Sequence, residues 1–408
     1  MAPKDGQAAT LAPPGRAEDA AGAPRAVLVV ASLFPHAKNE TLGLSTCRRT
    51  VELARLCEVK VLALTTRSDL AEREVLGGVE VVRPRWRRVP KLGLVVDGYR
   101  YAARAARALR EMLPAFDFDL IDAHWLYPDG FAAVRLAARL GKPVAVTGRG
   151  SDVNDFCFRW PVRHYARRAL REATHLFAVS RQLARRMADA GAPAERITVV
   201  HNGVDTALFC PGDRDAARRE LGLPPDGTLL VSAGSMVEDK GFQHLIAGLA
   251  LLPPGRSVRL YVAGPGPYRG TLERLAQDRG VADRVSFLGR VTQQQMPLWY
   301  RAADFFCFAS LKEGCPNVIL EALACGTPVV STNVGGIPDL VEEGQDGVLF
   351  EPGSAEPFAA ALERALARPW DRGGIAARGS RRSWGHVAAE YYRAFGHLLA
   401  RRSPERGT

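Results

Sequence analysis

Short apolar runs and longer amphipathic stretches alternate along this chain, first between residues 26 and 200 and again between residues 228 and 350. The runs are rich in Val, Leu and Ala and contain few polar positions, which is typical of strands buried on both faces of a parallel sheet. This pattern predicts strands over residues 26–32, 59–65, 79–83, 119–123, 143–147, 174–179, 197–200, 228–233, 258–263, 285–288, 305–309, 328–330 and 347–350.

Helical patterns fill the segments between these runs. They include residues 44–56, a helix capped by Ser180 that runs to residue 190, and residues 296–303, 317–324 and 384–401. Repeated strand–helix–strand units favour an α/β fold with two Rossmann-like domains. We place the boundary in the sequence His201-Asn202-Gly203-Val204-Asp205, so that residues 25–204 form the first domain and residues 205–383 the second, after a disordered tail at residues 1–24.

Two carboxylates make the segment 305–344 the best candidate for a binding site. Glu313 lies in the loop after a predicted strand, and Glu321 lies eight residues later in the following helix. Ligands bind at the carboxyl ends of parallel strands, where the next helix directs its positive end outward. Vicinal sugar hydroxyls supply the donors that carboxylates accept. Alternatively, Glu321 is a surface residue of the helix, and Glu313 is an acid near the helix N-cap that the helix dipole stabilises.

The same segment carries a longer motif: Glu313-Gly314-Cys315-Pro316, then Glu321-Ala322, Gly326, Pro328-Val329-Val330 and Gly335-Gly336-Ile337-Pro338. It resembles the E-x7-E hallmark of the retaining glycosyltransferases of family 4 (group 1), and only Asp339 departs from it, in place of Glu. The resemblance implies a GT-B fold, in which two Rossmann-like domains face a cleft and a closing helix at about 384–401 packs back on the first domain. It also implies that Glu313 and the backbone of residues 314–317 hold the donor sugar, while Glu321 takes the ribose hydroxyls.

The resemblance assigns further residues to the site. His124, at the end of a predicted strand, would lie beside the reacting sugar, and Lys240 would neutralise the donor diphosphate. Gln293 would lie beside the nucleobase or, equally, is only a solvated residue at a helix start. The implied catalytic residues are His124, Lys240 and Glu313. The implied donor-binding residues are Gly43, Arg149, Asn202, Ser235, Lys240, Val291, Glu313, Gly314, Cys315, Pro316, Asn317, Val318 and Glu321.

Three further departures from the family pattern lie outside this motif. Ser235 stands where the family has an arginine, which removes one positive charge from the vicinity of the leaving group. Arg149 replaces, or lies beside, a usual histidine and is predicted to compensate, because a guanidinium can bind a phosphate bidentately. The double glycine of the first loop is also missing, which leaves Gly43 as the residue that approaches the phosphates.

These assignments imply a retaining, same-face transfer of a sugar from a UDP- or GDP-sugar to a glycan, polysaccharide or lipid-linked acceptor. Asp117-Phe118-Asp119 looks like a DxD metal motif, but it enters a strand instead of leaving one. We therefore expect no metal and no cofactor. Two alternatives stay open: a non-catalytic sugar-nucleotide-binding subunit, which Ser235 favours, and a GT-B relative with epimerase or phosphorylase chemistry.

Positive charge is concentrated in the first half of the 408 residues. Residues 25–205 contain 30 Lys and Arg against 19 Asp and Glu, whereas residues 206–408 contain 23 against 22. The clusters at residues 83–91, 100–110 and 163–171 either solvate helices or attract an anionic membrane or a pyrophosphate-bearing acceptor. Nucleic acid is not an expected partner, because no known binding module accompanies the clusters.

Cysteine usage and hydropathy bear on the cellular compartment. The seven cysteines form no CxxC pair and indicate free thiols in a reducing environment. No uninterrupted run of about 18 apolar residues is present, and the first 24 residues lack the apolar core of a signal peptide. We expect a cytoplasmic protein, at most peripheral to the inner face of the membrane.

Overall fold

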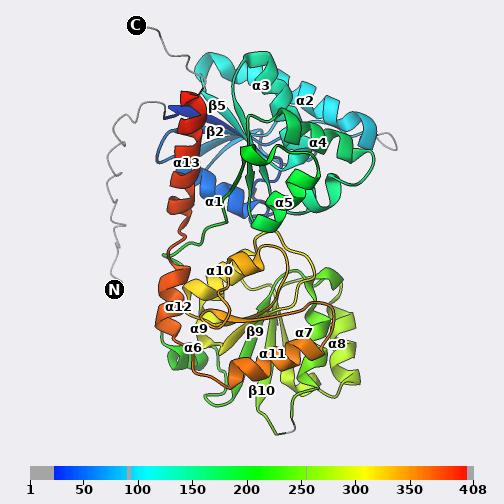
Figure 1. Cartoon of the computed structure of the whole chain (residues 1–408), viewed down its shortest axis with the longest axis vertical. Coiled ribbons are helices and arrows are strands. Elements are labelled where there is room, and N and C mark those ends of the chain that lie inside the picture. The colour runs from blue at the N-terminus through cyan, green and yellow to red at the C-terminus, as the bar shows by residue number, and fades with distance from the viewer. Residues whose placement is uncertain (1–22, 90–92, 254, 402–408) are drawn as a thin grey trace, which may run out of the picture.

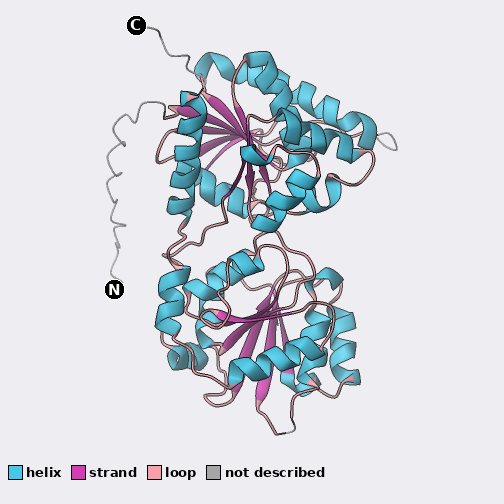
Figure 2. Ribbon diagram, in the orientation of Figure 1, coloured by secondary structure: helices cyan, strands magenta, loops and turns pink. Residues whose placement is uncertain are grey.

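The structure, a computed structural model, describes residues 23–89, 93–253 and 255–401. These residues form two α/β domains, which lie one above the other in Figure 1. Each domain has a central sheet with helices on both faces (Figure 2), so the predicted fold class is confirmed. The predicted tail at residues 1–24, apart from its last two positions, and Lys91 of the first basic cluster lie outside the described residues.

The sheet of the first domain has the strand order β3-β4-β2-β1-β5-β6-β7-β8 over the described residues. All neighbouring pairs are parallel except β3 with β4. The bounds are β1 Ala26–Val30, β2 Glu58–Leu62, β3 Arg73–Leu76, β4 Val79–Val82, β5 Leu120–His124, β6 Val144–Gly148, β7 His175–Ala178 and β8 Ile197–Val199.

Strand β3 was not predicted from the sequence. It forms a hairpin with β4 around Gly77 and Gly78, and Leu76 pairs with Val79. Both glycines have positive φ angles, 57° and 83°, as a tight two-residue hairpin turn requires. The Gly-Gly dipeptide was therefore an available signal for this edge strand.

Helices cover the two faces of the first sheet differently. Helices α1 (Leu44–Leu53) and α13 (Trp384–Ala400) pack on one face, where Tyr391 and Phe395 of α13 join the core around Phe177. Figure 1 shows α13 running along the first domain. The opposite face carries α2 Gly93–Met112, α3 Phe131–Leu140, α4 Val162–Glu172 and α5 Arg181–Asp189.

The sheet of the second domain is parallel throughout, with the order β11-β10-β9-β12-β13-β14. Its strands are β9 Thr228–Ala233, β10 Val258–Ala263, β11 Val285–Gly289, β12 Phe305–Phe308, β13 Val329–Thr332 and β14 Gly347–Phe350. One face carries α7 Phe242–Leu249, α8 Arg269–Asp278 and α11 Glu356–Leu366. The other side carries α6 Arg214–Glu220, α9 Met296–Ala302, α10 Asn317–Ala324 and α12 Arg372–Gly379.

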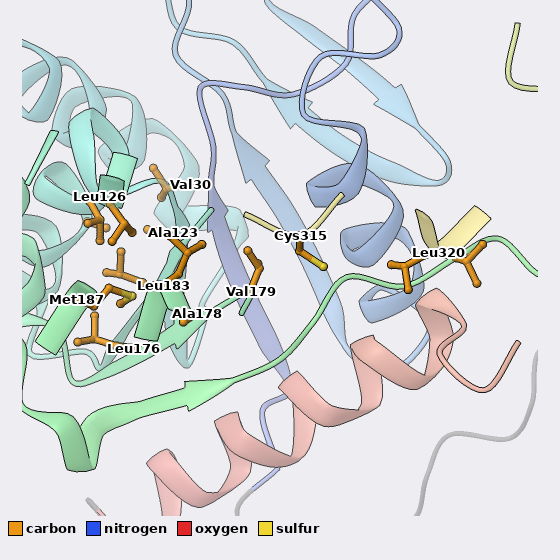
Figure 3. Packing of buried hydrophobic residues seen from close by; sticks show 14 of the residues in the cluster. Val30, Ala123, Leu126, Leu176, Ala178, Val179, Leu183, Met187, Cys315 and Leu320 are labelled. Carbon is orange, nitrogen blue, oxygen red and sulfur yellow. The ribbon is translucent and has the colours of Figure 1, made fainter. Parts of the chain in front are cut away.

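One apolar cluster contains residues of both domains. Figure 3 shows Cys315 and Leu320 of the second domain in the same cluster as Ala178 and Val179 of the first. All seven cysteines are free thiols, as predicted. None of the helices in the described ranges is both long and apolar enough to cross a bilayer.

Candidate active site

A cavity of about 550 Å³ lies between the two domains. Its lining comes mainly from the segments that follow β1, β5, β6, β8, β9 and β12, because the carboxyl ends of the two sheets face each other there. The sequence-predicted residues that line the cavity are Gly43, Arg149, Asn202, Ser235, Lys240, Glu313, Gly314, Cys315, Pro316, Asn317 and Val318. His124, Val291 and Glu321 are not among the lining residues.

Lys240 and Glu313 form an ion pair at the second-domain wall of the cavity. The Lys240 Nζ lies 2.5 Å from Glu313 Oε1. Gly241 brings their two loops together, because it has a φ of 69° and a Cβ atom there would lie only 1.8 Å from the carbonyl oxygen of Ala309. The two charges of this pair neutralise each other. When a ligand binds, a phosphate can replace Glu313 as the partner of Lys240, while a sugar hydroxyl donates a hydrogen bond to Glu313.

Helix α10 begins at the cavity and has no side-chain cap at its amino end. Its free backbone N–H groups and the positive end of its dipole suit an anion. The Asn202 side chain steadies this end, because its Nδ2 donates to the carbonyl oxygen of Cys315 at 3.0 Å and to Asn317 Oδ1 at 2.9 Å. Asn317 in turn donates to Ser45 Oγ of the first domain at 2.7 Å.

Arg149 reaches the cavity from the first domain. Its guanidinium donates to Asn202 Oδ1 at 2.9 Å and to Thr46 Oγ1 at 3.1 Å, and its Nη2 lies 3.0 Å from His124 Nδ1. All three partners are neutral groups, and Nε has no hydrogen-bond partner among the residues that the structure describes. Burial lowers the pKa of Arg149, yet a guanidinium stays charged at neutral pH. Arg149 therefore offers the cavity a cation whose side-chain partners carry no charge.

His124 ends β5 and is buried behind Arg149. Its Nε2 lies 3.3 Å from Asp122 Oδ2 and 2.6 Å from Arg49 Nη2. Burial, together with the nearby Arg49, lowers the pKa of His124 to about 3, so the ring is neutral at physiological pH. Both arginines can only donate, so the neutral ring accepts from one of them; in the tautomer that carries its proton on Nε2, directed to Asp122, Nδ1 accepts from Arg149. His124 therefore contacts the cavity through Arg149.

Arg49 and Asp122 form a buried ion pair that sequence reasoning missed. Their side chains are 1% and 0% exposed, and the Arg49 guanidinium also lies 4.3 Å from the ring centre of Tyr391 in α13. One signal was available: Asp122 interrupts an apolar strand two residues before His124, so both side chains lie on one side of that strand. A buried carboxylate requires a partner.

Glu321 lies next to the cavity, in a small hollow with Arg48, Gln293 and Asn317. Burial raises the pKa of its carboxyl to about 7, and Tyr300 donates a hydrogen bond to it at 3.0 Å. Gln293 is not merely solvated, because its Oε1 accepts from Arg48 Nη2 of the first domain at 2.6 Å.

Other contacts across the domain boundary involve glycine and acid positions of the motif. A Cβ atom on Gly314 would lie 2.2 Å from the carbonyl oxygen of Arg149, so only glycine permits this approach. Asp339, where the family has glutamate, accepts the backbone N–H of Arg181 at 2.7 Å and lies 3.1 Å from His201 Nε2. Val291 is a half-buried apolar residue packed against the core.

Solved structures resemble most of the chain. Sucrose-phosphate synthase (tll1590) from Thermosynechococcus elongatus has a TM-score of 0.77 and 21% identity, over 92% of this chain and 100% of that one. Anabaena Alr3699/HepE in complex with UDP has a TM-score of 0.69 and 21% identity, over 92% of this chain and 98% of that one. At such identities the likeness shows the fold alone, and this fold is GT-B, as predicted.

Sequence comparisons identify the family. The model described as "Glycosyltransferase Family 4" matches residues 46–208, and that described as "Glycosyl transferases group 1" matches residues 213–382. The D-inositol 3-phosphate glycosyltransferase of Mycolicibacterium smegmatis is 38% identical over 52% of this chain, and the match spans about half (50%) of that protein's length. The protein of that name from Acidothermus cellulolyticus is 34% identical over 337 residues, which are 77% of this chain and 75% of its own. The chain therefore belongs to the family 4 (group 1) glycosyltransferases.

Proposed function

We propose that this protein is a retaining glycosyltransferase that moves a sugar from a nucleoside-diphosphate sugar to a glycan, polysaccharide or lipid-linked acceptor. The observation that supports this most is the joint lining of one cavity by Lys240, Glu313 and the uncapped start of α10 from one domain and by Arg149 from the other. Two cations and a helix amino end suit a diphosphate, and Glu313 suits sugar hydroxyls.

In the proposed reaction, the acceptor hydroxyl oxygen attacks the anomeric carbon from the face that the diphosphate leaves. The bond from that carbon to the phosphate oxygen breaks, and a leaving phosphate oxygen takes the acceptor proton. Lys240 and the start of α10 stabilise the charge that develops on the leaving group, and Glu313 orients the sugar. His124 positions Arg149. We propose that these groups act without a metal or cofactor.

The names of similar proteins support particular choices of donor and acceptor. The curated relatives cited above are named D-inositol 3-phosphate glycosyltransferases, and Anabaena Alr3699/HepE is described in complex with UDP and with UDP-glucose. These names support a UDP-sugar over a GDP-sugar and an acceptor that carries a phosphate, to which the excess of Lys and Arg in residues 25–205 is suited. Release of UDP or GDP from matched sugar nucleotides, with and without phosphorylated acceptors, tests both choices.

The same assay separates the proposal from a non-catalytic sugar-nucleotide-binding subunit. A transferase releases the nucleoside diphosphate when donor and acceptor are both present, whereas a binding subunit binds the donor and leaves it intact. Epimerase or phosphorylase chemistry would instead change the donor sugar or require inorganic phosphate. Product analysis by mass spectrometry distinguishes these outcomes.

The Arg149→Ala variant is expected to turn over about 10- to 100-fold more slowly, because one hydrogen bond to a charged group contributes about 1.5–3 kcal/mol. If Arg149 compensates for the family arginine that Ser235 replaces, then Ser235→Arg should restore part of the lost turnover in the Arg149→Ala background. Steady-state kinetics of the wild type, both single variants and the double variant measure this. Unchanged turnover in Arg149→Ala would remove Arg149 from the site.

Binding of a nucleotide sugar is expected to strengthen about tenfold between pH 6 and pH 8. The pKa of Glu321 is raised to about 7, so the carboxylate that accepts ribose hydroxyls forms only as the pH rises through this range. A nucleotide sugar is used because its diphosphate does not titrate there. Calorimetry across the range should show the rise in the wild type and a flat profile in Glu321→Gln. Equal pH dependence in both proteins would contradict the assignment.

A further inference from the structure

Helices α2, α3 and α4 lie on the side of the first domain opposite α13 (Figure 1), and exposed aromatic side chains occur in α2 and in the segment just before α4. Six large hydrophobic side chains are exposed among the described residues, and three of them are here: Trp160 is 72% exposed, Tyr99 44% and Phe158 39%. Tyr99 packs on Tyr165 of α4 with ring centres 5.7 Å apart, so α2 and the start of α4 form one surface. Indole and phenyl groups left in water in this way suit a bilayer interface.

Unpaired positive charge surrounds these rings. Arg159 and Arg163 are exposed, and neither pairs with a carboxylate within the described part of the chain. The guanidinium groups of Arg186 and Arg167 lie 4.7 Å and 5.8 Å from the Phe158 ring centre. The one exposed acid of the segment from 151 to 163 is Asp155. The surface is therefore basic and aromatic at once.

Several arginines of the other predicted basic clusters already have an acidic partner. Arg83 is 2% exposed and is bonded to Glu74 and to the carbonyl oxygen of Pro35, so it is a buried structural residue and not part of a surface patch. Arg107 is paired with Glu111. Arg87, Arg100 and Arg110 are exposed and have no ion pair among the described residues, but Trp160 is the most exposed of the six large hydrophobic side chains, and free arginines flank it.

The same segment leads directly to the cavity. It begins with Arg149, which lines the cavity, and it reaches Trp160 eleven residues later. The Phe156 ring packs on Trp125, another lining residue, with ring centres 6.1 Å apart. The segment that carries Trp160 is thus packed, through Phe156, against the first-domain wall of the cavity.

We propose that the surface formed by Tyr99, Phe158, Arg159, Trp160 and Arg163 docks on an anionic lipid bilayer. Phe158 and Trp160 enter the headgroup region, and Arg159 and Arg163 contact lipid phosphates. This rests on the proposed function in one respect, because docking would present a lipid-linked acceptor to the cavity.

Flotation with vesicles of neutral phosphatidylcholine, and with vesicles that also contain phosphatidylglycerol, tests the docking. The wild type should bind the anionic vesicles, and brominated lipids should quench tryptophan fluorescence. Phe158→Ser/Trp160→Ser and Arg159→Ser/Arg163→Ser should each weaken binding about tenfold or more. The matched controls Leu251→Ser and Arg274→Ser, exposed residues of the second domain, should bind like the wild type.

Two results would overturn the proposal: no preference of the wild type for anionic vesicles, or wild-type binding by both patch variants. Thermal melting of every variant serves as the control that the fold is retained. The shift in melting temperature caused by a nucleotide sugar, recorded on the same preparations, tests the proposed function separately. A protein that binds the nucleotide sugar but not the vesicles would retain the proposed function and lose only the docking.

Discussion

Replacing Lys240 with alanine is expected to lower kcat about 30- to 1,000-fold, which corresponds to about 2–4 kcal/mol of lost transition-state stabilisation. The physical reason is that the leaving diphosphate gains charge as its bond to the sugar breaks. Ser235 replaces the arginine that the family has in this loop. Lys240 is therefore the remaining cation of the loop at the second-domain wall of the cavity. Glu313→Ala should cause a loss of the same order through poorer orientation of the sugar.

The control for this prediction uses the same loop. Lys312 is an exposed neighbour of Glu313, so Lys312→Ala should leave kcat unchanged. If Lys240 only held Glu313 in place, Lys240→Ala and the double variant Lys240→Ala/Glu313→Ala would be equally slow. The proposed separate roles predict that the double variant is slower than either single variant. Wild-type turnover in both single variants would show that the assignment is wrong.

Arg49→Met is expected to lower the free energy of unfolding by about 3–5 kcal/mol, because it leaves the Asp122 carboxylate buried without its cation. The contact of Arg49 with the Tyr391 ring is lost as well, which weakens the attachment of α13 to α1. Urea denaturation measures the change. Arg55→Met is the matched control: Arg55 is 63% exposed and pairs with Glu52 at 2.8 Å, and its loss should cost about 0.5 kcal/mol or less.

The pH dependence of this loss has a defined sign. Arg49 holds the pKa of Asp122 well below its usual range, so this carboxylate stabilises the wild type above about pH 4, and the stabilisation falls as the pH drops. Without Arg49, burial raises the pKa of Asp122, and the folded variant gains stability on protonation. The difference between the two proteins should therefore be smaller at pH 4.5 than at pH 7. A difference that grows toward low pH would contradict the ion-pair account.

The sequence was most informative where local pattern alone sets the structure. Buried parallel strands are continuous apolar runs, and β9, β10 and β12 begin at the residues expected from those runs. Ser180 caps α5 as predicted, through a hydrogen bond from the backbone N–H of Leu183. The fold class and the strand positions could be predicted from hydropathy, because a short continuous apolar run fits a strand that is buried on both faces of a parallel sheet.

Side-chain pairing was less predictable, because it depends on residues far apart in the chain. Arg49 and Asp122 are separated by 73 positions, and Asp339 meets Arg181 across 158. The sequence suggested that Arg149 binds a phosphate, but it gave no sign that His124 lies behind Arg149, with Nδ1 3.0 Å from the guanidinium. The carboxylates of the motif were found because their spacing within one loop and helix is local.

All the roles proposed above require that the cavity between the domains binds a nucleoside-diphosphate sugar. The most direct measurement is a thermal-shift series with UDP, GDP and their common sugar conjugates, each in EDTA. A ligand at about 100 times its dissociation constant adds about 2.7 kcal/mol of stability. The account predicts that one nucleotide series raises the melting temperature in EDTA and that Lys240→Ala reduces the rise. No shift with any nucleotide, in EDTA or with added divalent cations, would contradict it.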